Sequence, residues 1–389
     1  MNNKVFAVAA ATGLILSLAG STPAHDDKKD PQPGQKVERT LAVQPQATIT
    51  LCVASGALTV RGWDKPEVRV RSNDADQIEF RRIDKVKPNE PVLPANRVDV
   101  MVLDKTARAN PKLDCQAIAD VEMEVPAGAV VQVQTRDGDI DIAGVAGAYA
   151  GSQNGDITIE RATKLVEAGS VGGSIFLKNS SGRVNLTSAG GGVEATNVRA
   201  ASAEDTFEVG TVSGDIQLDR IANPKVMVKT VNGTLMMSGA LVKSGYYAFA
   251  NMTGDVVLTL PHDASFRLSA KVSDKKDIIS EFALTYLGET PTPAAPTTLP
   301  PTPKRPEVKE PKPPLKEKEA LKEKEKPLVK MTPPAKAPAA KGGPVVAPII
   351  VERSPVIAPY VRRVEAICGS GDAMISVASF GGTVRLKKL

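Results

Sequence analysis

A five-residue motif, Gly-Asp-Ile-x-Ile with close variants, recurs through the middle of the chain and constrains its fold more than any other feature. Clear units begin at Gly138, Gly155, Gly173, Gly214, Gly233 and Gly254, and weaker ones at Gly182 and Gly192. Strand side chains alternate between two faces, so the apolar pair of each unit shares one face. Because one unit cannot cover that face alone, neighbouring units must stack. The motif therefore predicts an all-β fold, a β-solenoid-like stack of short strand repeats.

The glycine and the polar residue that open each unit have a predicted role in the turn. We expect the glycine to adopt a positive φ and the residue beside it to hydrogen-bond the turn backbone. The acidic members of this position would form a row along one edge: Asp139, Asp156, Asp215, Asp255 and Asp372. A carboxylate row is also a calcium-binding arrangement. Other residue types interrupt the row, so we favour turn capping and expect no cofactor, with calcium as the alternative.

Two small sets of residues stand out as candidates for binding. Asp137, Asp139 and Asp141 form the most acidic local cluster and are the ion-binding candidates. Trp63, in a predicted turn, could stack on a sugar, and Phe176 is an apolar residue at an outward position of the repeat. For Trp63 and Phe176 the alternative is packing against the protein itself.

Composition and strand patterns divide the rest of the chain around the repeat. Alternating strands of ordinary antiparallel type precede it, and a segment with 16 of the 30 prolines follows it. Strand signals then return, which we interpret as the final coil after a long insertion. The predicted segments are 1–24, a signal peptide; 25–39, a flexible N-terminal segment; 40–128, an N-terminal β region; 129–290, the β-strand repeat domain; 291–349, a disordered Pro/Lys/Glu-rich linker; and 350–389, C-terminal β strands completing the repeat domain.

The first 24 residues predict export. They hold a single lysine, a short apolar run and a small-residue end, which is the pattern of a secretory signal peptide. The apolar run is short for a membrane span. The cleavage region has no nearby cysteine, which argues against a lipid anchor. We expect an exported protein of the periplasm, cell surface or extracellular space, with no transmembrane segment after signal removal.

Three cysteines allow one disulfide and leave one thiol in an oxidising compartment. Cys52 and Cys115 both lie on predicted strands of the N-terminal region, whereas Cys368 lies beyond the long linker. We therefore favour Cys52–Cys115 as the pair. Three buried, unpaired thiols are the alternative.

Several segments together resemble the adhesin family of bacterial β-strand-repeat proteins, a family of uncharacterised domains. The resemblance rests on the Gly-Asp-Ile-x-Ile units, on Ser55–Trp63 and on Gly369–Gly382, and it covers nearly all of the predicted folded chain. It implies a surface or adhesion role and supplies no catalytic residues. The long Pro/Lys/Glu-rich segment departs from the family pattern.

The sequence favours a non-enzymatic envelope or surface protein that presents a repeat face for adhesion or assembly. Its expected partner is a cell-envelope or surface polymer, or another protein. Nucleic acid is not expected, because 49 basic and 44 acidic residues nearly balance. One alternative is a polysaccharide-acting enzyme on a β-helix scaffold, although the only histidines are His25 and His262 and no catalytic motif is present. The other is an accessory component of envelope-stress sensing.

Overall fold

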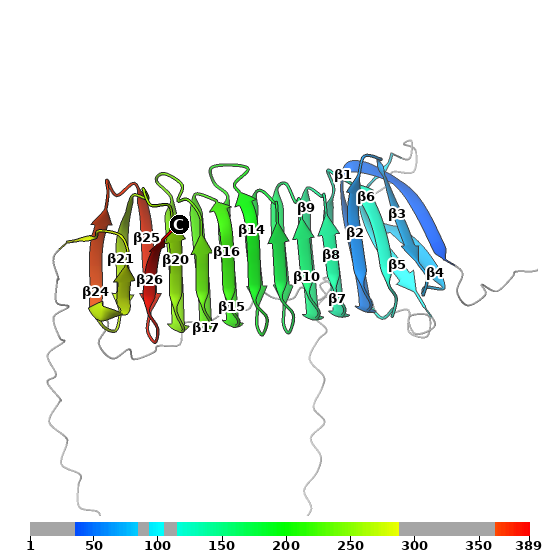
Figure 1. Cartoon of the computed structure of the whole chain (residues 1–389). Coiled ribbons are helices and arrows are strands. Elements are labelled where there is room, and N and C mark those ends of the chain that lie inside the picture. Colours follow the sequence, from blue (N-terminus) through cyan, green and yellow to red (C-terminus); the bar gives the residue numbers. More distant parts are fainter. Residues whose placement is uncertain (1–35, 85–92, 105–114, 288–361) are drawn as a thin grey trace, which may run out of the picture. The chain divides into compact units, whose positions relative to one another are not determined.

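Two sheets of mostly parallel strands face each other along the protein, and the chain passes from one sheet to the other in every coil (Figure 1). The computed structural model describes residues 36–84, 93–104, 115–287 and 362–389. The described residues belong to one structural unit. Within these ranges no helix is long and apolar enough to cross a membrane.

Sheet A contains the strand of each Gly-Asp-Ile-x-Ile unit. Its strands pair in parallel, each with the next coil's strand in register. In stacking order they are β2 (Leu58–Trp63), β8 (Ile140–Ala143), β10 (Ile157–Glu160), β12 (Ile175–Lys178), β14 (Val193–Arg199), β16 (Ile216–Ala222), β18 (Leu235–Ser238), β20 (Val256–Leu260), β26 (Val384–Lys388) and β22 (Ile278–Ser280).

Sheet B contains the second strand of each coil and is also parallel through the stack. In stacking order its strands are β1 (Val37–Ser55), β7 (Val130–Asp137), β9 (Gly147–Asn154), β11 (Leu165–Ser170), β13 (Arg183–Ser188), β15 (Thr206–Ser213), β17 (Lys225–Asn232), β19 (Tyr246–Thr253), β25 (Ala373–Ser379) and β21 (Phe266–Val272). The all-β repeat fold predicted from the motif is confirmed.

The core lies between the two sheets and is mainly aliphatic. Alternation along each strand places every second side chain inside, as in β10, where Ile157 and Ile159 are fully buried and Thr158 is not. Parallel register then stacks like on like, so that Ile140, Ile157 and Ile175 follow one another through the core. Small aliphatic side chains allow the two sheets to approach closely.

A column of glycines runs along one edge of the stack, at the turns that lead from sheet B to sheet A. From Gly138 onward each glycine lies directly against the carbonyl oxygen of the glycine one coil earlier, and Gly56 lies against that of Ala119; a Cβ on Gly155 would be 2.0 Å from the oxygen of Gly138. The column consists of Gly56, Gly138, Gly155, Gly173, Gly191, Gly214, Gly233, Gly254 and Gly382. We name it the glycine column. Close approach of successive backbones, not turn geometry alone, excludes a side chain there.

The sequence prediction of a positive φ at these glycines is confirmed only in part. Gly138 and Gly233 have φ +148° and Gly254 has φ +123°, so a positive φ does favour glycine at those three turns. Gly155 and Gly173 do not have a positive φ. For them the prediction is wrong, and the close carbonyl oxygen is the physical reason for glycine.

A buried polar side chain stands three residues before nearly every glycine of the column and binds the same turns. Ser170, for example, donates from Oγ to the carbonyl of Gly155 at 3.2 Å and accepts from the N–H of Gly173 at 2.9 Å. The inner polar row consists of Thr135, Ser152, Ser170, Ser188, Thr211, Thr230, Asn251 and Ser379, each at most 6% exposed. Most of its members donate to a glycine carbonyl. Buried polar groups in the turn are thereby satisfied between coils.

The N-terminal region is part of the stack and not a separate antiparallel sheet. Its strand β6 (Val121–Pro126) pairs in parallel with β2, and β5 (Ala95–Leu103) pairs in parallel with β1. Only β3 (Glu67–Ser72) and β4 (Gln77–Arg82) are antiparallel to their neighbours. The antiparallel prediction for residues 40–128 is therefore wrong for the strands that carry the stack. Strand β1 also begins at Val37, inside the segment predicted to be flexible.

The C-terminal strands fill a coil inside the stack and do not form its last coil. Strand β25 pairs with β19 on one side and with β21 on the other, and β26 lies between β20 and β22. The end is closed by β24 (Arg362–Cys368), antiparallel to β21, and by β23 (Thr285–Tyr286). The predicted return of the repeat is present, but the chain skips one coil after β20 and fills it more than 100 residues later.

Other segment predictions fall on residues that are not described. The predicted signal peptide at 1–24, most of segment 25–39 and the predicted linker at 291–349 lie outside the described residues, as do residues 350–361.

Candidate functional site

The repeated aspartates next to the glycine column bind the backbone of the following coil. Asp139 Oδ1 accepts from the N–H of Asp156 at 2.9 Å, and Asp156 Oδ1 accepts from the N–H of Ser174 at 2.8 Å. Asp215 and Asp255 accept in the same way from Thr234 and Thr383. These hydrogen bonds run between coils and account for a carboxylate at this position without an ion.

Asp372, assigned to this row from the sequence, and Gly182, assigned to the repeated motif, both lie elsewhere. Asp372 precedes β25 of sheet B, and its carboxylate accepts from Ser370 Oγ at 2.8 Å. Gly182 precedes β13, also in sheet B, so it opens the second strand of a coil. Both predictions are wrong because sheet B strands carry the same Gly-x-apolar-x-apolar pattern as sheet A strands.

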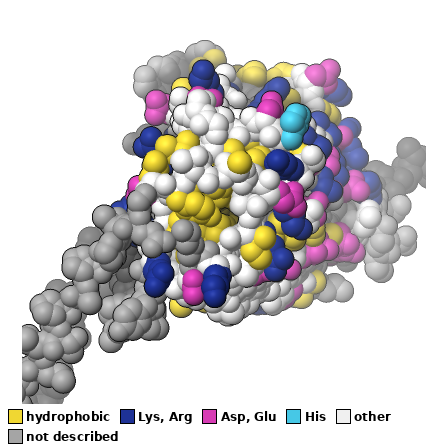
Figure 2. Space-filling model, turned by 60° about the vertical axis from the view of Figure 1, so that its left-hand side comes forward, with side chains coloured by type: hydrophobic (Ala, Val, Ile, Leu, Met, Phe, Trp, Pro, Cys, Tyr) yellow, Lys and Arg dark blue, Asp and Glu magenta, His cyan; other side chains and the backbone are white. Residues whose placement is uncertain are grey.

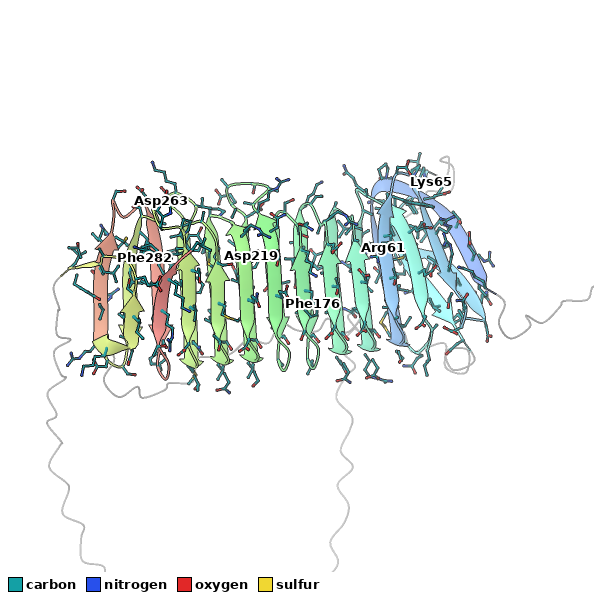
Figure 3. The ribbon with its side chains drawn as sticks, in the orientation of Figure 1. Arg61, Lys65, Phe176, Asp219, Asp263 and Phe282 are labelled. Carbon is teal, nitrogen blue, oxygen red and sulfur yellow. A yellow bond between two sulfur atoms is a disulfide. The ribbon has the colours of Figure 1, made fainter. Side chains whose placement is uncertain are left out.

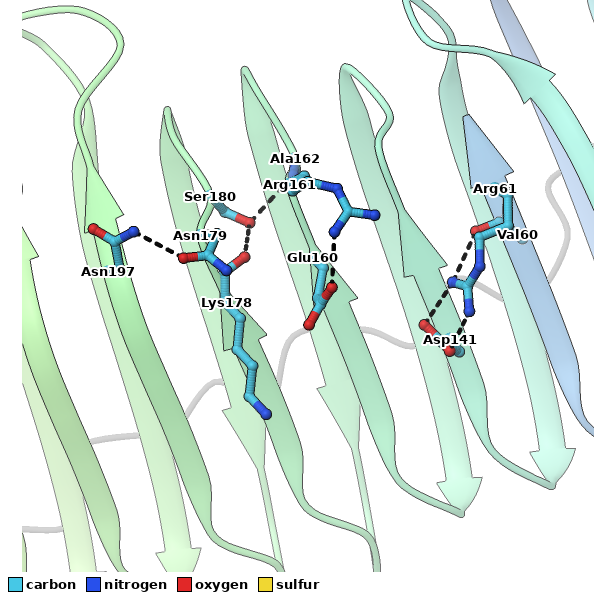
Figure 4. A network of polar contacts seen from close by, with 10 residues as sticks. All are labelled: Val60, Arg61, Asp141, Glu160, Arg161, Ala162, Lys178, Asn179, Ser180 and Asn197. Atoms are coloured by element: carbon cyan, nitrogen blue, oxygen red, sulfur yellow. Dashed lines mark hydrogen bonds and ion pairs between the residues drawn. The ribbon is translucent and has the colours of Figure 1, made fainter. Parts of the chain in front are cut away.

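The acidic cluster predicted as an ion site is divided among different partners. Asp137 accepts from Arg136 Nε and from Asn154 Nδ2, both at 2.8 Å, and the bond from Arg136 lowers the pKa of Asp137. Asp141 forms a bidentate ion pair with Arg61, in which Nη1 and Nη2 of Arg61 donate to Oδ1 and Oδ2 of Asp141 at 2.8 and 2.7 Å (Figure 4). Asp139 belongs to the row of repeated aspartates and accepts from the N–H of Asp156. In the described ranges no three His, Cys, Asp or Glu side chains are grouped as a metal site.

The last aspartate of the row makes stability depend on pH. The backbone N–H of Thr383 lowers the pKa of Asp255, as do the Thr383 hydroxyl and Arg385, against a smaller opposing effect of burial. A carboxyl with a lowered folded pKa stabilises the fold above its unfolded value near 3.8 and loses that contribution as pH falls through the folded pKa. We expect Asp255→Asn to flatten the fall of the thermal unfolding midpoint between about pH 5 and about pH 2. Asp263→Asn is the charge-matched control, and an equal flattening in both variants would contradict the assignment.

Trp63 and Phe176, the predicted surface-binding candidates, lie on the outer side of sheet A. Trp63 Nε1 donates to the carbonyl of Glu67 at 2.8 Å, while Lys65 Nζ and Arg69 Cζ lie 4.9 and 4.8 Å from the ring centroid. Cation–π contacts of this kind hold the ring against its own strands. Phe176 is half-buried between Thr158 and Glu194 of the adjacent strands (Figure 3). The structure does not bring the two aromatic residues together.

An unbroken apolar ridge follows the glycine column on the outside of six successive coils. Its members stand two residues before the column glycines: Val171, Ala189, Val212, Val231, Met252 and Phe380. Val171, Met252 and Phe380 are 48%, 40% and 43% exposed. Coils in a sheet are about 4.8 Å apart, so this apolar ridge is about 24 Å long. The residues that follow its members are glycine or uncharged polar residues, such as Ser213 and Asn232.

A second group of apolar side chains lies on the C-terminal end of the stack. Figure 2 turns this end toward the viewer and shows hydrophobic side chains among charged ones. The exposed members include Ile279 of β22, at 49%, and Leu287, directly after β23, at 41%. In the core near this end, Phe266 of β21 and the buried Phe282 pack edge to face, with ring centroids 5.6 Å apart.

The structure joins Cys52 and Cys115, the pair favoured by the sequence, in a disulfide. Cys368 is a free, half-buried thiol whose pKa is raised by burial. Disulfides persist in oxidising compartments, so this bond indicates a protein of the extracytoplasmic space.

Together these features define the class: a two-sheeted parallel β-solenoid whose repeated polar residues hold its coils together. The model of the Toastrack DUF4097 family matches residues 57–282, more than half of the chain. The chain belongs to this family. No curated protein matches it.

Two solved structures are similar at low sequence identity. One, from Parabacteroides merdae, is described as a "putative adhesin"; it is 8% identical and has a TM-score of 0.39, over 59% of this chain and 90% of its own. The other, from Clostridium sporogenes, is described as a "putative cell adhesion protein"; it is 10% identical and has a TM-score of 0.18, over 91% of this chain and 100% of its own.

Sequence reasoning missed the inner polar row and the apolar ridge, although both leave a readable signal. A Ser, Thr or Asn stands three residues before the column glycines, and an apolar residue stands two before, from Val171 onward. Counting from the glycine, and not from the isoleucines, reveals both columns.

Proposed function

We propose that this protein is a non-enzymatic, exported envelope or surface protein that presents the outside of a rigid β-solenoid for adhesion or assembly. The observation that carries the proposal is the apolar ridge. Most of the glycines, hydroxyls and carboxylates that repeat along the stack contact a neighbouring coil, whereas the ridge is regular and is exposed at four of its six positions.

The composition of the apolar ridge favours another protein as its partner. Aliphatic side chains, a methionine and a phenylalanine form its centre, and uncharged residues such as Asn232 and Thr253 border it. Protein interfaces have this arrangement of an apolar core depleted of charge and a polar rim. A sugar or an ionic polymer would instead require aromatic platforms or charges along the ridge.

The enzyme alternative requires convergent carboxylates in a groove. The repeated aspartates are separated along the stack and each accepts a backbone N–H, which supports the non-enzymatic proposal. Release of reducing or unsaturated sugar ends from envelope polysaccharides by the purified protein would favour the enzyme. Neighbouring genes for sensors and regulators would favour the stress-sensing alternative.

Binding of the mature protein to whole cells of the producing organism tests the proposal. We expect Met252→Ser with Phe380→Ser to weaken binding at least about 10-fold, which is about 1.4 kcal/mol, with little change in the thermal midpoint. Ile83→Ser with Ile118→Ser removes two exposed apolar residues elsewhere, at 43% and 57%, and is the matched control. Protease treatment of the cells should abolish binding, and calcium should not alter it. Equal binding by the ridge variant and the control would contradict a role for the ridge.

A further inference from the structure

The edge opposite the glycine column carries one unpaired cation on each of five successive coils. These cations lie in, or directly beside, the connections that lead from sheet A to sheet B: Lys164, Arg183, Arg199, Lys225 and Lys243. All five are exposed, and none forms an ion pair with another described residue. We name them the basic edge. Four coil steps of about 4.8 Å give it a length of about 19 Å.

The described carboxylates of this edge partly compensate Arg183 and form no ion pair with any of the five cations. Glu160 pairs with Arg161, and Asp219 pairs with Arg220, each within its own coil. Burial alone would raise the pKa of Asp205, but the N–H groups of Ser202 and Ala201 and the nearby charge of Arg183 hold it below its ordinary value. Its carboxylate is occupied by the loop backbone, at 2.7 and 2.8 Å. Glu204 is the remaining carboxylate in these connections, and it is exposed.

Arginine is retained on this edge where the backbone disfavours it. The position four residues after the start of the sheet A strand has a positive φ in six coils, and it holds Gly144, Asn179, Asn197 and Gly239 in four of them, residues that tolerate a positive φ. In two other coils the same position is Arg161, with φ +52°, and Arg220, with φ +51°. A long cationic side chain in this conformation costs free energy that asparagine or glycine would avoid.

The other edge has the opposite charge. The turns of the glycine column contain Asp139, Asp156, Asp215 and Asp255, and Arg136 there is paired with Asp137. An anionic polymer is therefore repelled by one edge and attracted by the other, so it would lie along the edge that carries the cations.

We propose that the basic edge binds a linear phosphate-bearing polymer that runs parallel to the stack and meets one cation on each coil. Phosphate is the chemistry that the free guanidinium forks of Arg183 and Arg199 match best, since arginine binds it through two parallel hydrogen bonds. The inference rests on the proposed surface function and adds an anionic polymer at the edge opposite the ridge. The protein then joins a protein partner on one edge to a polyanion on the other.

Binding of linear inorganic polyphosphate to the mature protein tests this inference. We expect Arg183→Gln with Arg199→Gln and Lys225→Gln to weaken binding at least 10-fold. Arg97→Gln with Lys271→Gln and Lys276→Gln makes the same change in net charge at exposed positions away from the edge, and we expect less than a two-fold effect. If five cations each neutralise one phosphate, affinity should fall about 100-fold between about 50 and about 200 mM salt.

The other outcomes are decisive. Equal losses in the two triple variants would reduce the effect to net charge and overturn the basic edge as a site. Tighter binding to polygalacturonate than to polyphosphate would overturn the phosphate assignment, and binding only to phosphatidylglycerol vesicles would overturn the linear polymer. If polyphosphate fails to bind but ridge-dependent binding to cells persists, this inference fails while the proposed function stands.

Discussion

Gly155→Ala is expected to destabilise the protein by about 3 kcal/mol, the upper end of the usual range for overpacking. Its new Cβ would lie 2.0 Å from the carbonyl oxygen of Gly138, and the backbone of Gly138 is held by the N–H···O bond to Asn154 at 3.0 Å. The coils must therefore separate or shift at this edge, against hydrogen bonds in both sheets. The loss should appear as a lower midpoint in urea denaturation followed by circular dichroism.

Gly210→Ala is the matched control. Gly210 lies within β15, and no heavy atom is within 4 Å of the position its Cβ would take. Removing the freedom of glycine in the unfolded chain stabilises by about 0.4 to 1 kcal/mol where the new side chain fits. A similar loss in both variants would show that the glycine column is not a steric requirement of stacking.

Loss of the Cys52–Cys115 disulfide is expected to lower stability by about 4 kcal/mol, the chain-entropy value for a loop of this size. The bond joins residues separated by 63 positions, and it ties β1 of sheet B to the segment that precedes β6. Cys52→Ser with Cys115→Ser should therefore lower the urea midpoint strongly, and the native protein should lose the same stability when reduced.

Cys368→Ser serves as the control for the disulfide variant. Its thiol is free and half-buried, with a single weak contact from Sγ to the carbonyl of Ala264 at 3.5 Å. We expect a change below about 1 kcal/mol. If reducing agent leaves the midpoint of the native protein unchanged, the disulfide does not stabilise the fold.

Local patterns predicted the parts of the fold that depend on local physics. Period-two alternation identified Ile157 and Ile159 as core residues, and the need to cover their face predicted the stack. The order of coils is not local. The local sequence Gly382-Thr383-Val384 does not specify that β26 lies between β20 and β22. Parallel register arises from contacts between segments that are distant in the sequence.

The candidate site was predicted less well than the fold. The sequence pointed to carboxylates and aromatic residues because those residue types carry chemistry in other proteins. In the structure the carboxylate of Asp156 binds the backbone of the next coil, and Trp63 packs under Lys65 and Arg69. The apolar ridge and the basic edge become visible only when side chains are aligned by coil, which requires knowing where each coil begins.

The central claim is that repeated polar residues build the solenoid and exposed columns perform its function. Comparing a variant of the aspartate row with a variant of the apolar ridge tests this claim most directly. Binding to whole cells and the urea midpoint are measured for Asp156→Ala and for Met252→Ser with Phe380→Ser. We predict that Asp156→Ala lowers the urea midpoint and leaves the affinity of the folded protein for cells unchanged. The ridge variant should keep the midpoint and lose affinity for cells. A folded Asp156→Ala protein that no longer binds cells, beside a ridge variant that binds normally, would contradict the account.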